Sequence, residues 1–445
     1  MKIFGTKRGA KRLSVNQTRR RSDTAVGSAV AEKEQKKGFP FKGISIALLA
    51  ILLVQILYFV AIYSQNSFIT KWRNIYITTA MDTLNHKWLA TAFIPADVID
   101  EVMAQRQESL AKQDGLESSW NPEDLNEAEK ETQTIGVDLS VVSKEEREAT
   151  VAKEAFYSIF HEIDRASLET YLEKNPQVME NGWDNLYINE AGLDDDGTSI
   201  RTIYDEQVLA IDAANKVLLV RAEGTGFKGV LAIAKDPSKL TLQASSMLGS
   251  YGETAGVIAE KHNGLIAITA SGFIDPDGVG NGGILAGYAM CDGKVHGNNH
   301  MGWGYKRLEI HEDDLMYIKD TSSPVGEGTT DAVEFQPALI IDGKIVVDAN
   351  CGYTGLHPRT CIGQSDKKEI LMMVIEGRMP TRSVGTDVIV CAEILKQHGA
   401  MQALNLDGGT SAMMWYDGEY VTKCSNQALP EGRPLPTAFV YERTN

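Results

Sequence analysis

Twenty consecutive uncharged residues, Ile44–Tyr63, constrain this chain more than any other feature. As an α-helix with a rise of ~1.5 Å per residue, the run is roughly 30 Å long and matches the hydrocarbon layer of a bilayer. Tyr58, Tyr63 and Trp72 cluster toward its C-terminal side, where an interfacial aromatic belt is expected. A cleaved signal peptide would have a shorter apolar core and a small-residue cleavage site. The sequence therefore predicts a retained transmembrane helix at 44–63, with an uncleaved or atypical signal as the alternative.

Charge differs between the two sides of this run. Residues 1–43 contain twelve Lys or Arg and three acidic residues, whereas the whole chain carries a net charge of −16. Because basic segments stay in the cytoplasm, we expect a cytoplasmic tail at 1–43, a single membrane pass through Ile44–Tyr63, and extracellular residues 64–445. The acidic balance excludes non-specific nucleic-acid binding, which needs a basic face.

Residues 64–184 have a helical texture. Ser67–Phe93 contains neither Gly nor Pro, which predicts a helix that ends before Pro95. Residues 96–180 are rich in Glu, Lys, Ala and Gln, which have high helix propensity. We interpret 64–184 as a membrane-proximal helical stalk that spaces and presents the rest of the chain, with partner binding as the alternative.

From residue 185 the texture changes to short β-branched runs separated by Gly, Asp and Asn turns. One helix is well marked, because Thr386 can cap it and Gly399 can end it. Residues 185–445 are therefore predicted to be one α+β domain dominated by mixed β-sheet. The expected strands include Val217–Val220, Val230–Ile233, Leu265–Ile268, Leu339–Ile341, Ile345–Val347 and Leu371–Ile375, with hairpin turns at Asp292-Gly293, Asp342-Gly343 and Asp417-Gly418.

Candidate chemistry gathers near the ends of two predicted strands. Asn405 and Asp407 alternate along one strand and so share a face, and Gly408-Gly409 lets the backbone turn there. Glu376 follows the other strand, close to Arg378. Two carboxylates suit acid–base work and arginines suit an anionic group. On these residues alone, a tight turn and a structural ion pair remain the alternative.

Longer motifs resemble the phosphodiester glycosidase family, which includes an enzyme that removes N-acetylglucosamine from a phosphodiester-linked cap on mannose 6-phosphate. The resemblance covers roughly residues 215–442 and includes bacterial members associated with exopolysaccharide. It rests on Arg359-Thr360, Gly363, Glu376-Gly377-Arg378, Ser383-Val384-Gly385, Gly399-Ala400, Asn405-Leu406-Asp407-Gly408-Gly409-Thr410-Ser411 and Leu435-Pro436-Thr437-Ala438, with Gly272-Phe273 and Asp275-Pro276 upstream.

The resemblance implies cleavage of a sugar 1-phosphodiester in a surface glycan or phosphoglycan. Under this hypothesis Arg359 and Arg378 hold the phosphate, Asp407 is base or nucleophile, and Glu376 is the second carboxylate. The residues expected to bind substrate are Thr269, Ser271, Gly272, Asp275, Arg382, Ser383, Asn405, Gly408, Gly409, Thr410 and Ser411.

The sequence departs from the family pattern at some positions. The family usually has Asn where this chain has Thr269 or Ala270, and Asp where it has Glu376. Glu376 keeps the charge with a longer reach, whereas the departure at Thr269 or Ala270 favours the alternative of a catalytically impaired glycan-binding or envelope-assembly protein with the same fold.

Metal and thiol chemistry have weaker support. The loop with Asp275, Asp277 and Asn281 could hold Ca²⁺ through side-chain oxygens, although a glycine-rich structural loop is the simpler reading. No other cofactor is predicted. Cys351 and Cys361 could close a disulfide in an exported domain, and two free thiols are the alternative.

Overall fold

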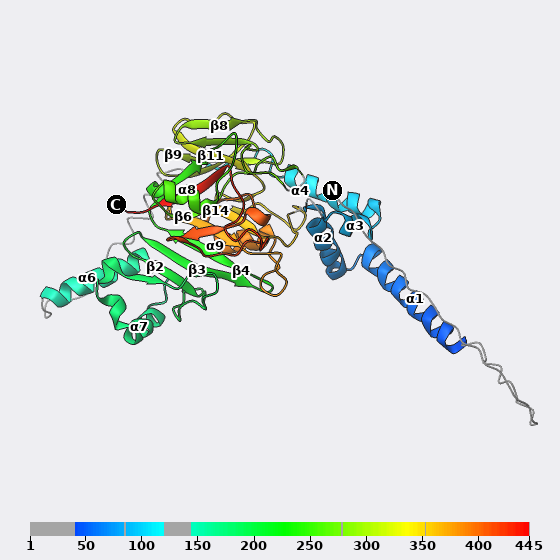
Figure 1. Cartoon of the computed structure of the whole chain (residues 1–445), viewed down its shortest axis with the longest axis horizontal. Helices are drawn as coiled ribbons and strands as arrows, with labels where there is room; N and C mark the ends of the chain where they lie inside the picture. The colour runs from blue at the N-terminus through cyan, green and yellow to red at the C-terminus, as the bar shows by residue number, and fades with distance from the viewer. Residues whose placement is uncertain (1–40, 84–85, 120–143, 277–278, 352, 445) are drawn as a thin grey trace, which may run out of the picture. The chain divides into compact units, whose positions relative to one another are not determined.

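The computed structural model describes residues 41–83, 86–119, 144–276, 279–351 and 353–444 (Figure 1). Most of the basic tail, residues 1–40, lies outside them. The chain divides into two compact units, Met1–Tyr58 and Phe59–Asn445. Helix α1 (Phe41–Tyr63) begins in the first unit. Among the described residues, its segment Gly43–Tyr63 is the one helix with the length and hydropathy to cross a membrane, which confirms the predicted apolar helix.

The unit 59–445 is an α+β fold, as predicted, and the strand pairs of its described sheets are antiparallel. In the described residues, the strands form one large sheet and two smaller ones. The large sheet has the order β1 (Tyr187–Asn189), β2 (Val208–Asp212), β3 (Val217–Gly224), β4 (Phe227–Ala234), β15 (Ile370–Ile375), β14 (Arg359–Ser365), β16 (Ala400–Asn405), β12 (Ala338–Ile341) and β13 (Lys344–Ile345). One smaller sheet has the order β10 (Met316–Asp320), β9 (Lys306–His311), β11 (Thr329–Phe335), β7 (Tyr288–Cys291) and β8 (Lys294–Asn298), and the other has the order β18 (Glu419–Tyr420), β17 (Met414–Tyr416), β6 (Gly264–Thr269), β19 (Thr437–Glu442) and β5 (Leu240–Ala244).

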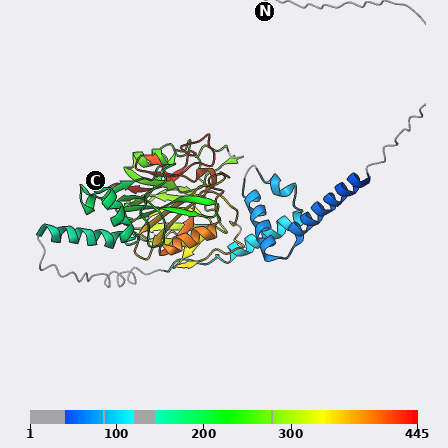
Figure 2. The same cartoon turned by 90° about the horizontal axis from the view of Figure 1, so that it is seen from below.

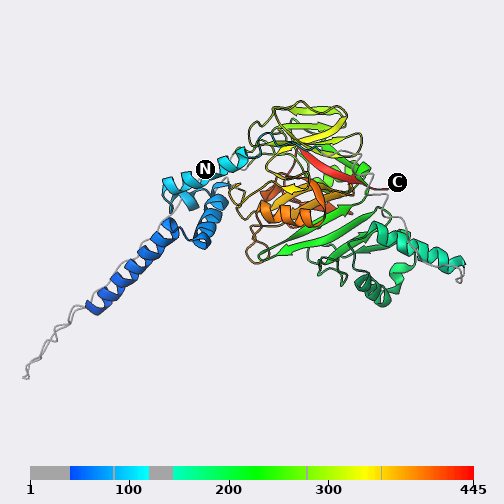
Figure 3. The same ribbon diagram turned by 180° about the vertical axis from the view of Figure 1, so that it is seen from behind.

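The large sheet is buried on both faces, which explains its nearly continuous apolar strands. Alternate residues of β3 enter different cores: Leu219 packs with the two smaller sheets, and Leu218 packs with helices on the other face. The helices of the second core are α6 (Lys144–Ile159), α7 (Arg165–Lys174) and α9 (Val388–Gln397). Figures 2 and 3 show α9, in orange, against this sheet. Helix α8 (Ala255–Lys261) lies against β6.

The predicted turns are confirmed by backbone geometry. Asp342 and Gly343 have φ angles of 47° and 71° and join β12 to β13, as expected for Asp-Gly in a two-residue hairpin. The predicted cap of α9 is wrong by one residue. Asp387, rather than Thr386, accepts the N–H groups of Ile389 and Val390, both at 3.0 Å.

The helix predicted over Ser67–Phe93 is interrupted in the structure. Helix α2 (Ser67–Met81) is followed by the short α3 (Trp88–Thr91) and by α4 (Ala96–Ala111). The break follows from Thr83, whose hydroxyl donates to the Ala80 carbonyl and accepts the His86 N–H, so that the side chain competes with helical hydrogen bonds. The three helices share a small apolar core that includes Ile77, Ala90, Ile94, Val98 and Val102.

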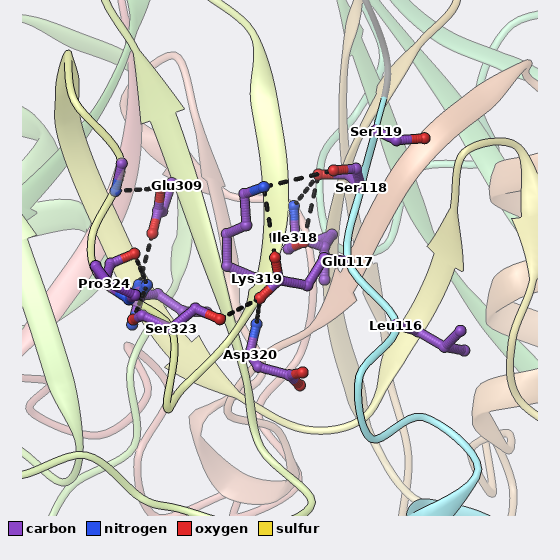
Figure 4. A network of polar contacts seen from close by, with 12 residues as sticks. Leu116, Glu117, Ser118, Ser119, Glu309, Ile318, Lys319, Asp320, Ser323 and Pro324 are labelled. Carbon is purple, nitrogen blue, oxygen red and sulfur yellow. Dashed lines mark hydrogen bonds and ion pairs between the residues drawn. The ribbon is translucent and has the colours of Figure 1, made fainter.

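The segment after α4 ties these helices to the sheet that begins with β10. Ser118 and Ile318 exchange hydrogen bonds, with the Ser118 N–H 2.9 Å from the Ile318 carbonyl oxygen (Figure 4). Glu117 accepts the Asp320 N–H at 3.0 Å, and Lys306 donates to the Leu116 carbonyl at 2.7 Å. We call residues 113–119 the strap. Because of these contacts, the helical segment predicted as a stalk packs with the sheets in one unit.

Candidate active site

A cavity of about 800 Å³ lies at one edge of the large sheet. Because neighbouring strands are antiparallel, the start of β14 and the ends of β15 and β16 meet at this edge. The cavity is closed on another side by α2, α4 and the turn after α2. Its polar lining residues include Asp82, Arg106, Asp275, His357, Arg359, Arg378, Asn405, Asp407, Thr410, Ser411 and Arg433, with Gly408 and Gly409 between them.

Arg359 is fixed by backbone carbonyl groups. Its Nε donates to Thr386 at 3.1 Å, and its Nη2 donates to Tyr353 at 2.8 Å and Gly355 at 2.7 Å. The side chain is buried. These bonds hold a permanent positive charge rigidly in the cavity wall, so the charge is available to an anion without reorganisation.

Arg378 supplies the second positive charge and reaches open solvent, although protein atoms surround most of its length. Burial and then the charge of Arg359 lower the pKa of the Arg378 guanidinium. Its Nη2 lies 3.4 Å from Nδ1 of His357. Burial, together with both arginines, lowers the pKa of His357 to about 2, so this imidazole is neutral. Two like charges held together create a strong local preference for an anion.

Asp407 lies half-buried where β16 ends. Burial raises its pKa to about 6, against the opposing effects of the Ser411 hydroxyl, Arg433 and the Gly408 N–H. Backbone hydrogen bonds hold the following turn. Gly409 donates its N–H to the carbonyl of Pro358, just before β14, and Ser411 donates its N–H to the carbonyl of Gly408. Gly409 has φ 60°, and a Cβ there would lie 3.3 Å from Nη1 and Nη2 of Arg378. The glycine therefore makes room for the guanidinium beside Asp407.

Asp275 is a second carboxylate that lines the cavity, and its pKa is shifted in the opposite direction from that of Asp407. Although burial opposes the shift, the Arg433 side chain and the Gly280 N–H hold the pKa of Asp275 below its usual value. The Arg433 Nη1 and the Gly280 N both lie 2.6 Å from its oxygens. Asn281 is likewise engaged with the backbone of Gly283 and Ser250. These donors occupy the oxygens proposed for Ca²⁺, and Asp277 lies outside the described residues.

A third carboxylate comes from the far side of the cavity. Asp82, which follows α2, pairs with Arg106 of α4 at 2.6 Å, and burial raises its pKa despite the charges of Arg106 and Arg359. Its Oδ2 faces Nε2 of His357 at 4.0 Å, and neither buried atom has a hydrogen-bond partner in the described structure. Because Arg378 approaches Nδ1 of this neutral imidazole, the remaining ring proton sits on Nε2. The two atoms thus offer one donor and one acceptor across a narrow gap.

Glu376, Arg382 and Ser383 do not join the cavity. Glu376 is buried and makes a two-pronged ion pair with Arg382, with its Oε1 2.9 Å from Nη2 and 2.8 Å from the Lys423 N–H. Ser383 donates to the Glu376 carbonyl at 2.6 Å. Glu376 and Arg382 line a separate cavity of only about 20 Å³. Glu376 and Asp407 therefore do not line the same cavity, so they do not form the predicted pair of carboxylates. Glu376 fits the alternative of a structural ion pair.

The residues predicted around the Thr269 loop support the cavity from behind. Thr269 is buried and donates to the Ser411 carbonyl, and the Ala270 carbonyl accepts the Asp407 N–H at 3.2 Å. Ser271 is buried against Thr437, with their hydroxyl oxygens 2.6 Å apart. Gly272 packs against the Phe335 ring. Asn405 is also buried and donates to the Gln336 carbonyl at 2.7 Å, although it borders the cavity.

Sequence reasoning missed Asp82, Arg106, His357 and Arg433. Asp82 and Arg106 come from helices that the sequence predicts only as a stalk, and nothing in local periodicity shows that a helix docks on a distant sheet edge. His357 lies two residues before the chosen Arg359, so its neighbourhood was the one available signal. The five cysteines are free thiols in the described structure, which selects the alternative without a Cys351–Cys361 disulfide.

Comparison with known proteins supports the family resemblance. Residues 263–442 match the family model described as phosphodiester glycosidase, which confirms the resemblance for this segment. No curated protein matches this chain significantly.

Among solved structures, the catalytic domain of zebrafish N-acetylglucosamine-1-phosphodiester alpha-N-acetylglucosaminidase, auto-inhibited by its pro-peptide, is similar at 17% identity. The match covers 51% of this chain and 82% of that chain, with a TM-score of 0.43. A hypothetical protein from Synechocystis matches at 12% identity over 54% and 65% of the two chains, with a TM-score of 0.38. A Burkholderia pseudomallei protein described as exported matches at 16% identity over 48% and 74%, with a TM-score of 0.37.

Proposed function

We propose that this protein is a membrane-anchored hydrolase that cleaves a sugar 1-phosphodiester in a surface glycan. The observation that carries the proposal is the meeting of Arg359, Arg378 and Asp407 at one cavity, within the segment matched by the phosphodiester glycosidase model. Water attacks the anomeric carbon, and the bond from that carbon to the bridging phosphate oxygen breaks. The products are a free sugar and a phosphomonoester, and the proton lost by water passes through a base to the phosphate.

Arg378 and Arg359 hold the phosphate in this proposal. Arg359 is immobilised by three carbonyl groups, whereas Arg378 is exposed to solvent in the cavity and is the better direct ligand. Their mutual repulsion is relieved when an anion binds between them. The same charges stabilise the leaving phosphate as the glycosidic bond breaks. Because a phosphate oxygen leaves as a weak base, strong acid assistance is not needed.

Asp407 is the base in this proposal. Its pKa of about 6 leaves it mostly ionised at neutral pH and still basic enough to accept a proton from water. Asp275 has its pKa shifted the other way and remains ionised, so it can stabilise positive charge that develops on the sugar ring. Opposite pKa shifts in two carboxylates of one cavity are a pattern typical of divided catalytic roles.

Asp82 and His357 bind a sugar hydroxyl in this proposal. The 4.0 Å between Oδ2 of Asp82 and Nε2 of His357 leaves no room for an atom directly between them. A hydroxyl oxygen to one side of the pair, about 2.8 Å from both atoms, would donate to the first and accept from the second, which would satisfy both unpaired groups. A buried polar group left without a partner costs free energy, so the gap favours a polar ligand. The helices next to α1 would then take part in substrate recognition.

The location proposed for this activity follows from α1 and the charge distribution. The helix Gly43–Tyr63 fits a single membrane anchor, and the basic segment before it favours a cytoplasmic N-terminus. The unit 59–445 would then face the extracellular side, where surface glycans are found.

The direct test is release of N-acetylglucosamine from N-acetylglucosamine 1-(methyl phosphate) by the full chain in detergent. We expect turnover by the wild type and a loss of about 10²–10⁴-fold with Asp407→Asn. Asp194→Asn is the matched control, because Asp194 is exposed and does not line the large cavity. Binding of the ester without release of sugar would instead support a glycan-binding protein, and near-normal turnover by D407N would remove Asp407 from the mechanism.

A further inference from the structure

One face of α2 carries a row of aromatic side chains that runs into the cavity. Phe68, Trp72 and Tyr76 are spaced by four residues and therefore lie on one side of the helix. They are unusually open to solvent: 69% of Phe68 and 52% of Trp72 are exposed. The rings of Phe68 and Trp72 lie edge to face with centroids 6.4 Å apart. We call these three residues the aromatic row.

The inner end of the row reaches the phosphate-binding wall. Thr79 continues the same side of α2, Thr83 follows the end of the helix at Met81, and both line the cavity together with Tyr76. Thr79 packs against Gly355, whose carbonyl accepts a hydrogen bond of 2.7 Å from Arg359. A phosphate at Arg359 and Arg378 would therefore lie next to this end of the row.

The outer end of the row lies next to the apolar helix in the chain. Helix α1 ends at Tyr63 and α2 begins at Ser67, so Phe68 follows the candidate membrane span by only a few residues. The 11 residues from Phe68 to Thr79 rise roughly 16 Å, about half of the ~30 Å hydrocarbon layer and hence the length of one lipid chain. Exposed aromatic side chains in a continuous group mark a surface that binds an apolar partner.

We propose that the second ester of the substrate phosphate is a lipid, and that its hydrocarbon chain lies along the aromatic row while the sugar occupies the cavity. This inference rests on the proposed function and deepens it, because it assigns a class to the group beyond the phosphate. The bond broken remains the one between the sugar and the bridging oxygen. The lipid phosphomonoester is then a product that the row holds and releases toward the membrane.

The test compares two esters that differ only in the alkyl group. Full chain in lipid nanodiscs is assayed with the methyl and the octyl phosphodiester of N-acetylglucosamine, and in parallel for binding of methyl phosphate and octyl phosphate, with empty nanodiscs subtracted. We expect the wild type to favour each octyl compound by about 100-fold, since the additional methylenes leave water. The double variant F68S/W72S should lower that preference by about 10-fold and change the values for the methyl compounds by less than about twofold.

Phe93→Ser provides the matched control. Phe93 is 57% exposed, similar to Trp72, but lies between α3 and α4 rather than on the row. Wild type that treats both alkyl lengths alike overturns the lipid assignment even where sugar is released. The assignment is also overturned if F68S/W72S and F93S lower the octyl preference equally, because that result indicates general membrane adsorption. It is overturned as well if F68S/W72S weakens the methyl and octyl compounds equally, because that result indicates damage to the fold. If neither ester is cleaved, the proposed reaction fails, and the alkyl phosphate binding still decides whether the row holds a lipid chain.

Discussion

Replacing Asp407 by Asn is expected to abolish turnover and to stabilise the protein near neutral pH. Burial raises the pKa of the Asp407 carboxyl from 3.8 to about 6, so the fold disfavours its charged form. The unfolded chain keeps the ordinary pKa. Between about pH 4 and pH 6 the folded state therefore binds more protons than the unfolded state, and the free energy of unfolding falls as pH rises.

The structure sets the size of this effect. A difference of about two pKa units corresponds to about 3 kcal/mol, which is an upper bound because water in the cavity reaches the half-buried carboxyl. The carboxamide of D407N does not ionise. The stability gained by D407N over wild type should be near zero at about pH 4, increase up to about pH 6, and stay constant above about pH 7.

The assay is thermal unfolding of the full chain without ligand, with wild type and D407N measured across this pH range. Asp275→Asn is a control of opposite sign. Because its charged form is favoured by Arg433, D275N should be less stable than wild type near pH 7. This deficit should stay nearly constant down to about pH 4 and shrink only below the ordinary pKa of 3.8, as pH falls toward the lowered pKa of Asp275. A D407N advantage that does not change with pH would refute the reasoning, since it would come from packing rather than from ionisation.

Four further outcomes are expected. Arg378→Ala should lower kcat/KM for the methyl ester by about 10²–10³-fold with little change in thermal stability, because the side chain faces solvent in the cavity. Arg382→Ala should lower stability and leave turnover intact. The free energy of unfolding, measured with denaturant, should fall by about 3 kcal/mol because the buried Glu376 carboxylate loses its ion pair, whereas the kcat of the folded fraction should be retained. Asp82→Ala should raise KM about tenfold with a smaller change in kcat, measured in the same steady-state assay, if its unpaired oxygen binds a sugar hydroxyl. Gly409→Ala should lower both stability, by about 1 kcal/mol, and turnover, because a φ of 60° strains a residue with a Cβ and because the Arg378 guanidinium, 3.3 Å from the added methyl group, has to shift.

Local chemistry in the sequence predicts much of the sheet framework. Asp-Gly pairs adopt left-handed backbone angles at hairpins, and β-branched runs form strands, because both preferences are decided by nearest neighbours. Asp407 follows a predicted strand, whereas Arg359 begins β14, which is not among the expected strands. Antiparallel pairing of β14 with β16 brings the two residues to one edge. This much follows once the strand order is known.

Other features depend on geometry that periodicity does not contain. Glu376 and Arg378 are two residues apart and would share a face of a regular strand. Arg378 instead has φ 60°, which ends the alternation, so Glu376 turns toward Arg382 while Arg378 enters the cavity. The docking of α2 is equally hidden, because the contacts of Thr78 and Thr79 with residues near Gly355 span more than half of the chain.

The strap also has a consequence for the order of assembly during synthesis. Ser118 leaves the ribosome 200 residues before its partner Ile318. Thr79 of α2 leaves it 277 residues before its partner Leu356. Contacts between residues so far apart in the sequence form slowly, because the entropy of closing a long loop is lost before the contact contributes any stabilisation. The cavity wall contributed by Asp82 and Arg106 can therefore be completed only after nearly the whole polypeptide has emerged, so a nascent or truncated chain has no finished binding site to expose.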